Sequence, residues 1–236
     1  MILEAAKRWV GPQATVVARC VLRGYPIPRW GNLRRTAPFS PNYGFERGTP
    51  IDRHYLDAFL SAHRDRIAGD VLEVQTNSYT ERFGSTVRRS DTFDIVPQYS
   101  PTYLCDLSYC EEIIPTASYD CVLLPNMLPH VRELDLALIQ LQRIVRPDGV
   151  ILASAAGLLP LTGDVPEFSR LTPDGWRSRL AAAWPGATID VRGHGNCLAA
   201  IGAQLGLALE ELMPSELDVH DPRYPVLNTI AARFPR

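Results

Sequence analysis

A charged side chain lies inside an apolar segment of this sequence. Glu73 belongs to the run Val71-Leu72-Glu73-Val74, and the polar turn Gln75-Thr76-Asn77 follows directly. The run predicts a buried strand, and burying a carboxylate is costly unless it gains hydrogen-bond partners or a ligand. Glu73 therefore either caps a neighbouring helix or contacts a bound molecule, and both interpretations are open at this point.

A histidine follows a second apolar run. Residues 119–124 predict another buried strand, and His130 stands shortly after it, between Pro129 and Val131. An imidazole has an ordinary pKa of about 6.5, so His130 could accept a proton from a substrate near neutral pH. The alternative is a residue at the start of a helix that faces solvent.

Other polar side chains are candidates for substrate contact. Asp52 and His54 stand near Arg47 and could bind a substrate or pair with one another. His194 lies in a Gly-His-Gly-Asn turn that could border a pocket or cap the next helix. Tyr43 ends a segment rich in proline and aromatic residues, which could close over a substrate or simply anchor the chain.

The remaining pattern predicts the elements that must position these side chains. Helical spacing or capping residues predict helices over 50–67 (capped by Thr49), over 134–145, from Pro173 (capped by Thr172) and over 196–212. Strands or extended pieces are predicted in 71–74, 86–96, 102–107, 119–124, 150–153, 188–192 and 226–234. Strands that alternate with helices favour a mostly parallel sheet covered on both faces. We therefore expect an α/β, Rossmann-like, doubly wound domain over residues 50–236, with a seven-stranded sheet, after an irregular N-terminal extension or lid over residues 1–49.

Composition and missing motifs disfavour several classes of protein. The 24 Lys and Arg residues nearly balance the 26 Asp and Glu residues, which disfavours nucleic-acid binding, and no apolar run approaches the roughly 20 residues that span a bilayer. Five cysteines without a CxxC pair predict a reduced, cytoplasmic protein without a metal site. The sequence also lacks the GxGxxG, GxxxxGK[ST], GxSxG and HExxH motifs of several large enzyme classes.

Three segments together resemble the class I S-adenosylmethionine-dependent methyltransferases. Val71-Leu72-Glu73-Val74 resembles the family's first strand, Ser118-Tyr119-Asp120-Cys121-Val122-Leu123-Leu124 resembles its fourth, and Arg143-Ile144-Val145-Arg146-Pro147-Asp148-Gly149-Val150 resembles its helix, Pro-Gly turn and fifth strand. The resemblance covers the chain from Tyr43 to the C-terminus. The string from Tyr43 to Arg53 is similar to a narrower bacterial subfamily, often associated with sugar-bearing metabolites.

The resemblance implies a site for S-adenosylmethionine at the ends of the first four strands, where doubly wound folds bind ligands. The residues implied to contact this cofactor are Glu73, Gln75, Asn77, Tyr79, Asp94, Asp106, Leu107, Asn126 and Met127. Two positions depart from the family pattern. Gln75 replaces a glycine that lets the backbone approach the cofactor, and Val96 stands where an acid would hold the ribose. Asp94, two residues earlier and on the same strand face, is the expected substitute.

The implied activity is methyl transfer to oxygen or nitrogen of a small polar metabolite, with S-adenosylhomocysteine as product. A sugar or amino sugar in secondary-metabolite (antibiotic) biosynthesis is the implied acceptor, with His130 as base and Tyr43, Arg47, Asp52, His54 and His194 near the acceptor. We expect no nucleic-acid or membrane partner, and a monomer or homodimer. The alternative is a repurposed methyltransferase fold that serves as a binding or partner subunit or catalyses other chemistry.

Overall fold

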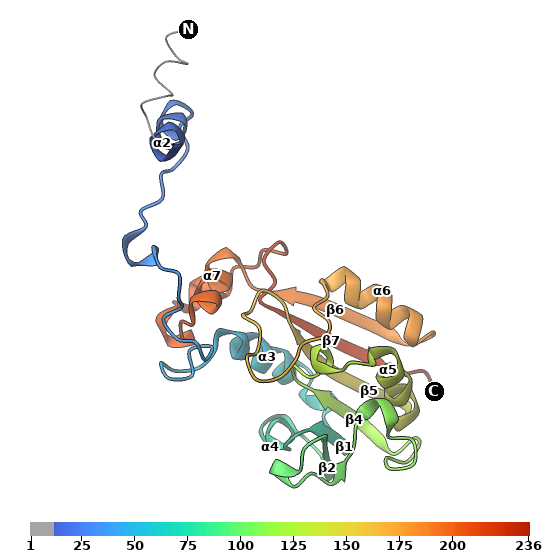
Figure 1. Cartoon of the computed structure of the whole chain (residues 1–236). Helices are drawn as coiled ribbons and strands as arrows, with labels where there is room; N and C mark the ends of the chain where they lie inside the picture. Colours follow the sequence, from blue (N-terminus) through green and yellow to red (C-terminus); the bar gives the residue numbers. More distant parts are fainter. Residues whose placement is uncertain (1–11) are drawn as a thin grey trace. The chain divides into compact units, whose positions relative to one another are not determined.

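The computed structural model describes residues 12–236 and divides the chain into two units, residues 1–37 and Pro38–Arg236 (Figure 1). In the first unit, helix α2 (Pro12–Leu22) is followed by a short 3-10 turn, Gly31–Leu33. Residues 1–11, which belong to the predicted extension, lie outside the described residues. No described helix has the length and apolar character that a membrane span requires.

The second unit is built on a seven-stranded sheet with the order β3-β2-β1-β4-β5-β7-β6 (Figure 1). Strands β1 to β5 pair in parallel, and β7 runs antiparallel to both β5 and β6. The strands are β1 (Gly69–Val74), β2 (Val87–Asp94), β3 (Tyr103–Leu104), β4 (Tyr119–Leu124), β5 (Val145–Ala156), β6 (Thr188–His194) and β7 (Leu227–Arg233). The helices are α3 (Ile51–Ala62), α4 (Ser78–Phe83), α5 (Leu134–Ile144), α6 (Pro173–Ala183), α7 (Cys197–Leu205) and α8 (Pro214–Leu217). The predicted fold class is confirmed.

Helices cover both faces of this sheet because alternate strand residues point to opposite sides. On one face, α5 and α6 pack with strand residues such as Leu72 and Val122. On the other face, α3 and α7 pack with Val71 and Cys121. Both clusters are buried, and together they hold the strand ends in fixed positions.

The predicted start of α3 is wrong. Thr49 does not cap this helix; its hydroxyl donates to Oε1 of Glu210 at 2.7 Å, and its backbone N–H donates to Oε2 at 2.9 Å. Pro50 occupies the N-cap position, and the helix ends at Ala62 rather than near residue 67. By contrast, Thr172 caps α6 as predicted, accepting from the Gly175 N–H at 3.1 Å.

The predicted helix over 196–212 is too long. Asn196 caps α7, accepting from the Ala199 N–H at 3.0 Å, but the helix stops at Leu205. Gly206 ends it in the left-handed region, with φ of 69°, which glycine adopts without steric cost. The sequence stays apolar past this glycine, so hydrophobic spacing alone does not mark the end.

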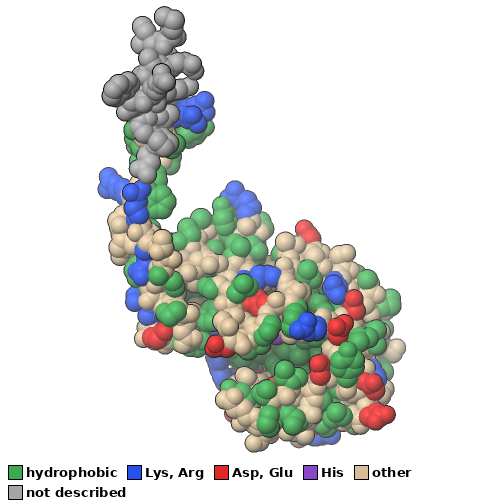
Figure 2. Space-filling view, viewed as in Figure 1, with side chains coloured by type: hydrophobic (Ala, Val, Ile, Leu, Met, Phe, Trp, Pro, Cys, Tyr) green, Lys and Arg blue, Asp and Glu red, His purple; other side chains and the backbone are tan. Residues whose placement is uncertain are grey.

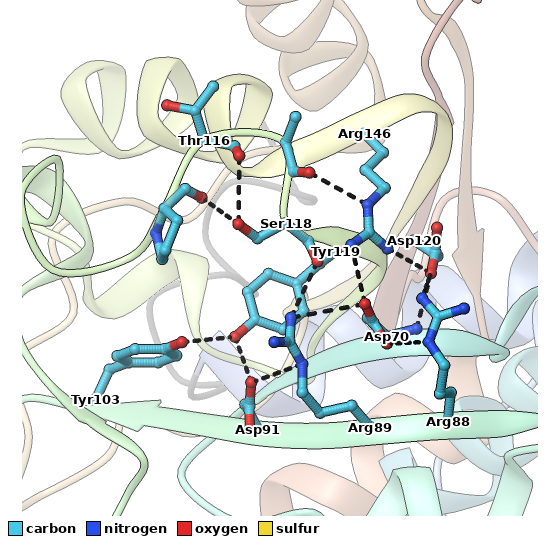
Figure 3. Close-up of polar contacts among 12 residues, drawn as sticks. Asp70, Arg88, Arg89, Asp91, Tyr103, Thr116, Ser118, Tyr119, Asp120 and Arg146 are labelled. Carbon is cyan, nitrogen blue, oxygen red and sulfur yellow. Dashed lines mark hydrogen bonds and ion pairs between the residues drawn. The ribbon is translucent and has the colours of Figure 1, made fainter.

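An ion-pair network joins the amino-terminal parts of the parallel strands (Figure 3). Arg146 donates to Asp70 at 2.9 Å and to Asp120 at 2.7 Å, and Arg88 donates to Asp70 at 2.8 Å. Hydrogen bonds from Arg88 and Arg146 hold the pKa of Asp70 well below its usual value. The charged groups of this edge are thus paired with one another, whereas the carboxyl-terminal strand ends surround a cavity.

Candidate active site

A cavity of about 530 Å³ lies at the carboxyl-terminal ends of β1, β2 and β4. The space-filling view shows a hollow in this face of the second unit (Figure 2). The volume is within the usual range for small-molecule sites. Seven of the predicted site residues line it: Gln75, Asp94, Asp106, Leu107, Asn126, Met127 and His130.

Two carboxylates line the cavity, and each uses only one of its oxygens as an acceptor in a local turn. Asp94 is the last residue of β2, and its Oδ1 accepts from the Val96 N–H at 3.1 Å. Asp106 follows β3, and its Oδ1 accepts from the Ser108 N–H at 2.8 Å. Neither carboxylate forms an ion pair within the described part of the chain. Both can therefore accept hydrogen bonds from the hydroxyl or amino groups of a ligand.

The turn after β1 holds Gln75 in a conformation that favours glycine. Its φ is 68°, and its N–H donates to the Phe93 carbonyl at 2.8 Å, which continues the pairing of β1 with β2. A left-handed conformation costs a non-glycine residue roughly 1–2 kcal/mol. The backbone thus keeps the path that a glycine would give, while the Gln75 side chain forms part of the cavity wall.

Glu73 faces helix α4 rather than the cavity. Its side chain is buried, with the residue 1% exposed, and it accepts from the Tyr79 N–H at 3.0 Å and from the Thr80 N–H and hydroxyl at 2.8 and 2.7 Å. Burial raises the pKa of this carboxyl despite the three hydrogen bonds, which lower it. The helix-capping interpretation accounts for both oxygens, so direct contact with a cofactor stays a prediction.

Asn77 and Tyr79 are also absent from the cavity lining. Asn77 immediately precedes α4 and accepts the Glu81 N–H through its carbonyl at 2.9 Å. The Tyr79 hydroxyl accepts from Nη1 of Arg53 at 2.8 Å. Their cofactor contacts remain predictions as well.

Asn126 connects the cavity to helix α3. It has a φ of 53°, its N–H donates to the Ser154 hydroxyl at 2.9 Å, and that hydroxyl donates back to Oδ1 at 3.1 Å. Its amide group donates to Oδ2 of Asp52 at 3.1 Å, and Asp52 is only 6% exposed. The buried Asp52 therefore contacts the cavity lining through its hydrogen bond with Asn126. Sequence reasoning did not select Ser154, which directly follows the predicted strand 150–153, although a single hydroxyl in the apolar run 150–156 was a usable signal.

His130 is oriented by the loop between β5 and α6. Its Nδ1 lies 3.0 Å from the Pro166 carbonyl oxygen, which can only accept, so Nδ1 carries the hydrogen. In the neutral ring, Nε2 is then the acceptor, as a general base requires. Three residues of the loop, Thr162, Val165 and Phe168, line the cavity and were not predicted from the sequence.

Hydrogen bonds within the loop hold it in place. Arg170 donates to the carbonyls of Gly157 and Pro160, each at 3.3 Å, and to Glu167. Burial opposes ionisation of Glu167, but its hydrogen bonds with Arg170 and Thr162 and the nearby positive charge lower its pKa. Glu167 is thus an ionised anchor for the loop.

The other predicted acceptor residues lie outside the cavity lining. Arg47 donates to Glu211 at 2.8 Å, and the buried Tyr43 hydroxyl has no partner within the described residues. His54 and His194 line a separate cavity of about 220 Å³, and burial and the nearby His220 lower the pKa of His194. Their acceptor contacts stay predictions. Within residues 12–236, no group of His, Cys, Asp and Glu is arranged to hold a metal ion.

No protein-family model matches this sequence, and no curated protein matches it. The fold is similar to that of an S-adenosylmethionine-dependent methyltransferase from Mesorhizobium loti (TM-score 0.52, 14% identity, 78% of this chain and 99% of that one). It is also similar to a candidate sarcosine dimethylglycine methyltransferase from Galdieria sulphuraria (0.51, 13%, 79% and 90%) and to a possible exported protein from Bordetella parapertussis (0.51, 13%, 81% and 72%). At these identities the likeness concerns the fold alone, a Rossmann-like fold of the kind found in the two methyltransferases.

Proposed function

We propose that this chain transfers a methyl group from S-adenosylmethionine to oxygen or nitrogen of a small polar metabolite. The observation that carries the proposal is the pair Asp94 and Asp106, which line one cavity at the carboxyl-terminal strand ends, each with an oxygen left for a ligand. Ligands of doubly wound folds bind at this edge of the sheet. The class I methyltransferase fold supports the choice of cofactor.

The cavity residues fit this cofactor by their chemistry. Asp94 would accept hydrogen bonds from the ribose hydroxyls, and Asp106 would accept from the adenine amino group, with Leu107 against the ring. Asn126 and Met127 would line the space beside them. When bound, the cofactor supplies a methyl group activated by a sulfonium, so the protein has mainly to align the acceptor with it.

His130 would act on the acceptor. Its Nε2 would take the proton of an acceptor hydroxyl, whereas a neutral amine needs no base because it is already nucleophilic. Asp52 would contact the acceptor, and its hydrogen bond from the cavity residue Asn126 supports this assignment. We favour a sugar or amino sugar of secondary metabolism as acceptor, on the subfamily resemblance, and a cytoplasmic monomer or homodimer.

Calorimetric titration with S-adenosylmethionine and S-adenosylhomocysteine tests the cofactor. Micromolar binding is expected, and Asp94→Asn and Asp106→Asn should each weaken it by about 10- to 100-fold, since a hydrogen bond to a charged group contributes roughly 1.5–3 kcal/mol. Asp65→Asn is the matched control, because Asp65 is exposed and away from the cavity. A folded protein that binds neither molecule at millimolar concentration would refute the proposal. The alternative, a repurposed methyltransferase fold, would then be favoured, because Gln75 and Val96 depart from the family pattern.

A further inference from the structure

A guanidinium without a carboxylate partner lines the same cavity. Arg132 lies over the ring of Phe168, with its Cζ 4.3 Å from the ring centroid, and both residues belong to the cavity wall. Within residues 12–236, Arg132 forms no ion pair. A guanidinium that stacks on an aromatic ring through its face keeps its N–H edges for hydrogen bonding.

Hydrogen bonds join the two segments that carry this stacked pair. The Phe168 N–H donates to the Pro129 carbonyl at 2.8 Å, and the His130 side chain donates through Nδ1 to the Pro166 carbonyl at 3.0 Å. The segment after β4 is thereby joined to the loop after β5, and Arg132 follows this junction by two residues. The guanidinium stacks at the cavity wall and is not paired with a protein carboxylate. Binding a ligand there therefore costs less entropy of ordering the arginine side chain.

The charges of the cavity are divided between its two sides. Asp94 ends β2 and Asp106 follows β3, whereas Arg132 follows β4, beyond β1 in the sheet order. The loop between β5 and α6 has two acidic residues. Glu167 already accepts from Arg170 and Thr162, and Asp164 does not belong to the cavity lining. Arg132 therefore supplies a positive charge on the side of the cavity away from the two carboxylates, and it forms no ion pair within the described residues.

We propose that the acceptor carries an anionic group, a carboxylate or a phosphate, which Arg132 binds in a bidentate manner. This inference rests on the proposed function, because it assigns the His130 side of the cavity to the acceptor. Arginine binds both groups through its planar fork of N–H donors. Phe168 acts as a positioning residue that holds the guanidinium.

The test uses sugars that differ in charge. Glucuronate, glucose 6-phosphate and glucose are titrated into the full chain with saturating S-adenosylhomocysteine, and again without it. The anionic sugars should bind and glucose should not; the preference between glucuronate and glucose 6-phosphate identifies the group. Arg132→Gln should weaken anion binding by about 10- to 100-fold, the range expected for loss of charged hydrogen bonds. Arg132→Lys should recover only part of it, and Phe168→Leu should weaken it while binding of S-adenosylhomocysteine is unchanged.

Arg64→Gln is the control, because it removes the same charge from an exposed residue outside the cavity. Equal binding of glucose and the anionic sugars, no saturable binding of either anionic sugar, or unchanged anion binding in Arg132→Gln would overturn the inference. Anion binding through Arg132 by a protein that does not bind S-adenosylhomocysteine would instead refute the proposed function and leave the anion site standing.

Discussion

Substitutions of Glu73 test whether this carboxylate caps helix α4 or holds the cofactor. Glu73→Ala removes the acceptor of three donors, two of which, the N–H and hydroxyl of Thr80, are buried. A buried donor without a partner costs about 1–3 kcal/mol, so the free energy of unfolding should fall by about 3 kcal/mol. Glu73→Gln keeps one oxygen for Thr80 and loses the bond to the Tyr79 N–H, so it should cost about 1 kcal/mol.

The same residue gives a signed pH dependence. Burial raises the pKa of Glu73 above its usual 4.5 in the folded chain, so the folded state holds this proton more tightly than the unfolded state does. The Glu73 contribution to the free energy of unfolding is therefore fully present below pH 4.5 and decreases as pH rises through the folded-state pKa. Glu73→Gln lacks this proton, so the difference between wild type and variant should shrink from acidic to neutral pH.

Urea unfolding at several pH values measures the stabilities, and calorimetry with S-adenosylhomocysteine measures binding. Glu73→Gln should retain binding within about threefold, since the carboxylate does not line the cavity. Equal losses of stability in the Ala and Gln variants would contradict the capping argument. A folded Glu73→Gln protein with tenfold weaker binding would show that Glu73 contacts the cofactor, as the sequence resemblance implies.

The sheet was largely predictable because buried parallel strands have a strong local signal. Residues 119–124 were predicted as a strand, and β4 has those bounds. Thr172 before Pro173 marked the start of α6 for the same reason, since the cap needs only adjacent residues. Thr49 has similar local sequence, but Glu210, which is 161 residues away, takes its hydroxyl. A remote partner of this kind leaves no local signal.

The cavity was predictable where it depends on strand ends and hidden where it depends on a loop. Asp94 and Asp106 lie near the carboxyl-terminal ends of extended segments, so topology alone brings them to one edge of the sheet. Phe168 reaches the cavity because its N–H bonds to the Pro129 carbonyl, and no periodicity in the loop sequence indicates that bond. Arg132 was overlooked although it stands only two residues after His130, because its charge alone did not distinguish it from a solvated arginine.

Four further substitutions test local features of the structure. Gln75→Gly should change the free energy of unfolding by less than about 1 kcal/mol, because relief of the left-handed conformation offsets the added freedom of the unfolded chain, and should tighten S-adenosylhomocysteine binding in calorimetry. Arg146→Met should cost about 2 kcal/mol in urea unfolding near neutral pH. Because the pKa of Asp70 is lowered in the folded chain, this loss should narrow as pH falls below about 4. Trp184→Phe should cost about 1–3 kcal/mol more than Trp176→Phe. Both rings are buried, but the Trp184 Nε1–H donates to a backbone carbonyl of α5 at 2.8 Å, whereas the Trp176 Nε1–H has no partner in the described chain. Phenylalanine leaves a similar void at either position, so the difference between the two variants combines loss of the Trp184 hydrogen bond with removal of the unpaired Trp176 N–H, and equal losses would contradict both contributions.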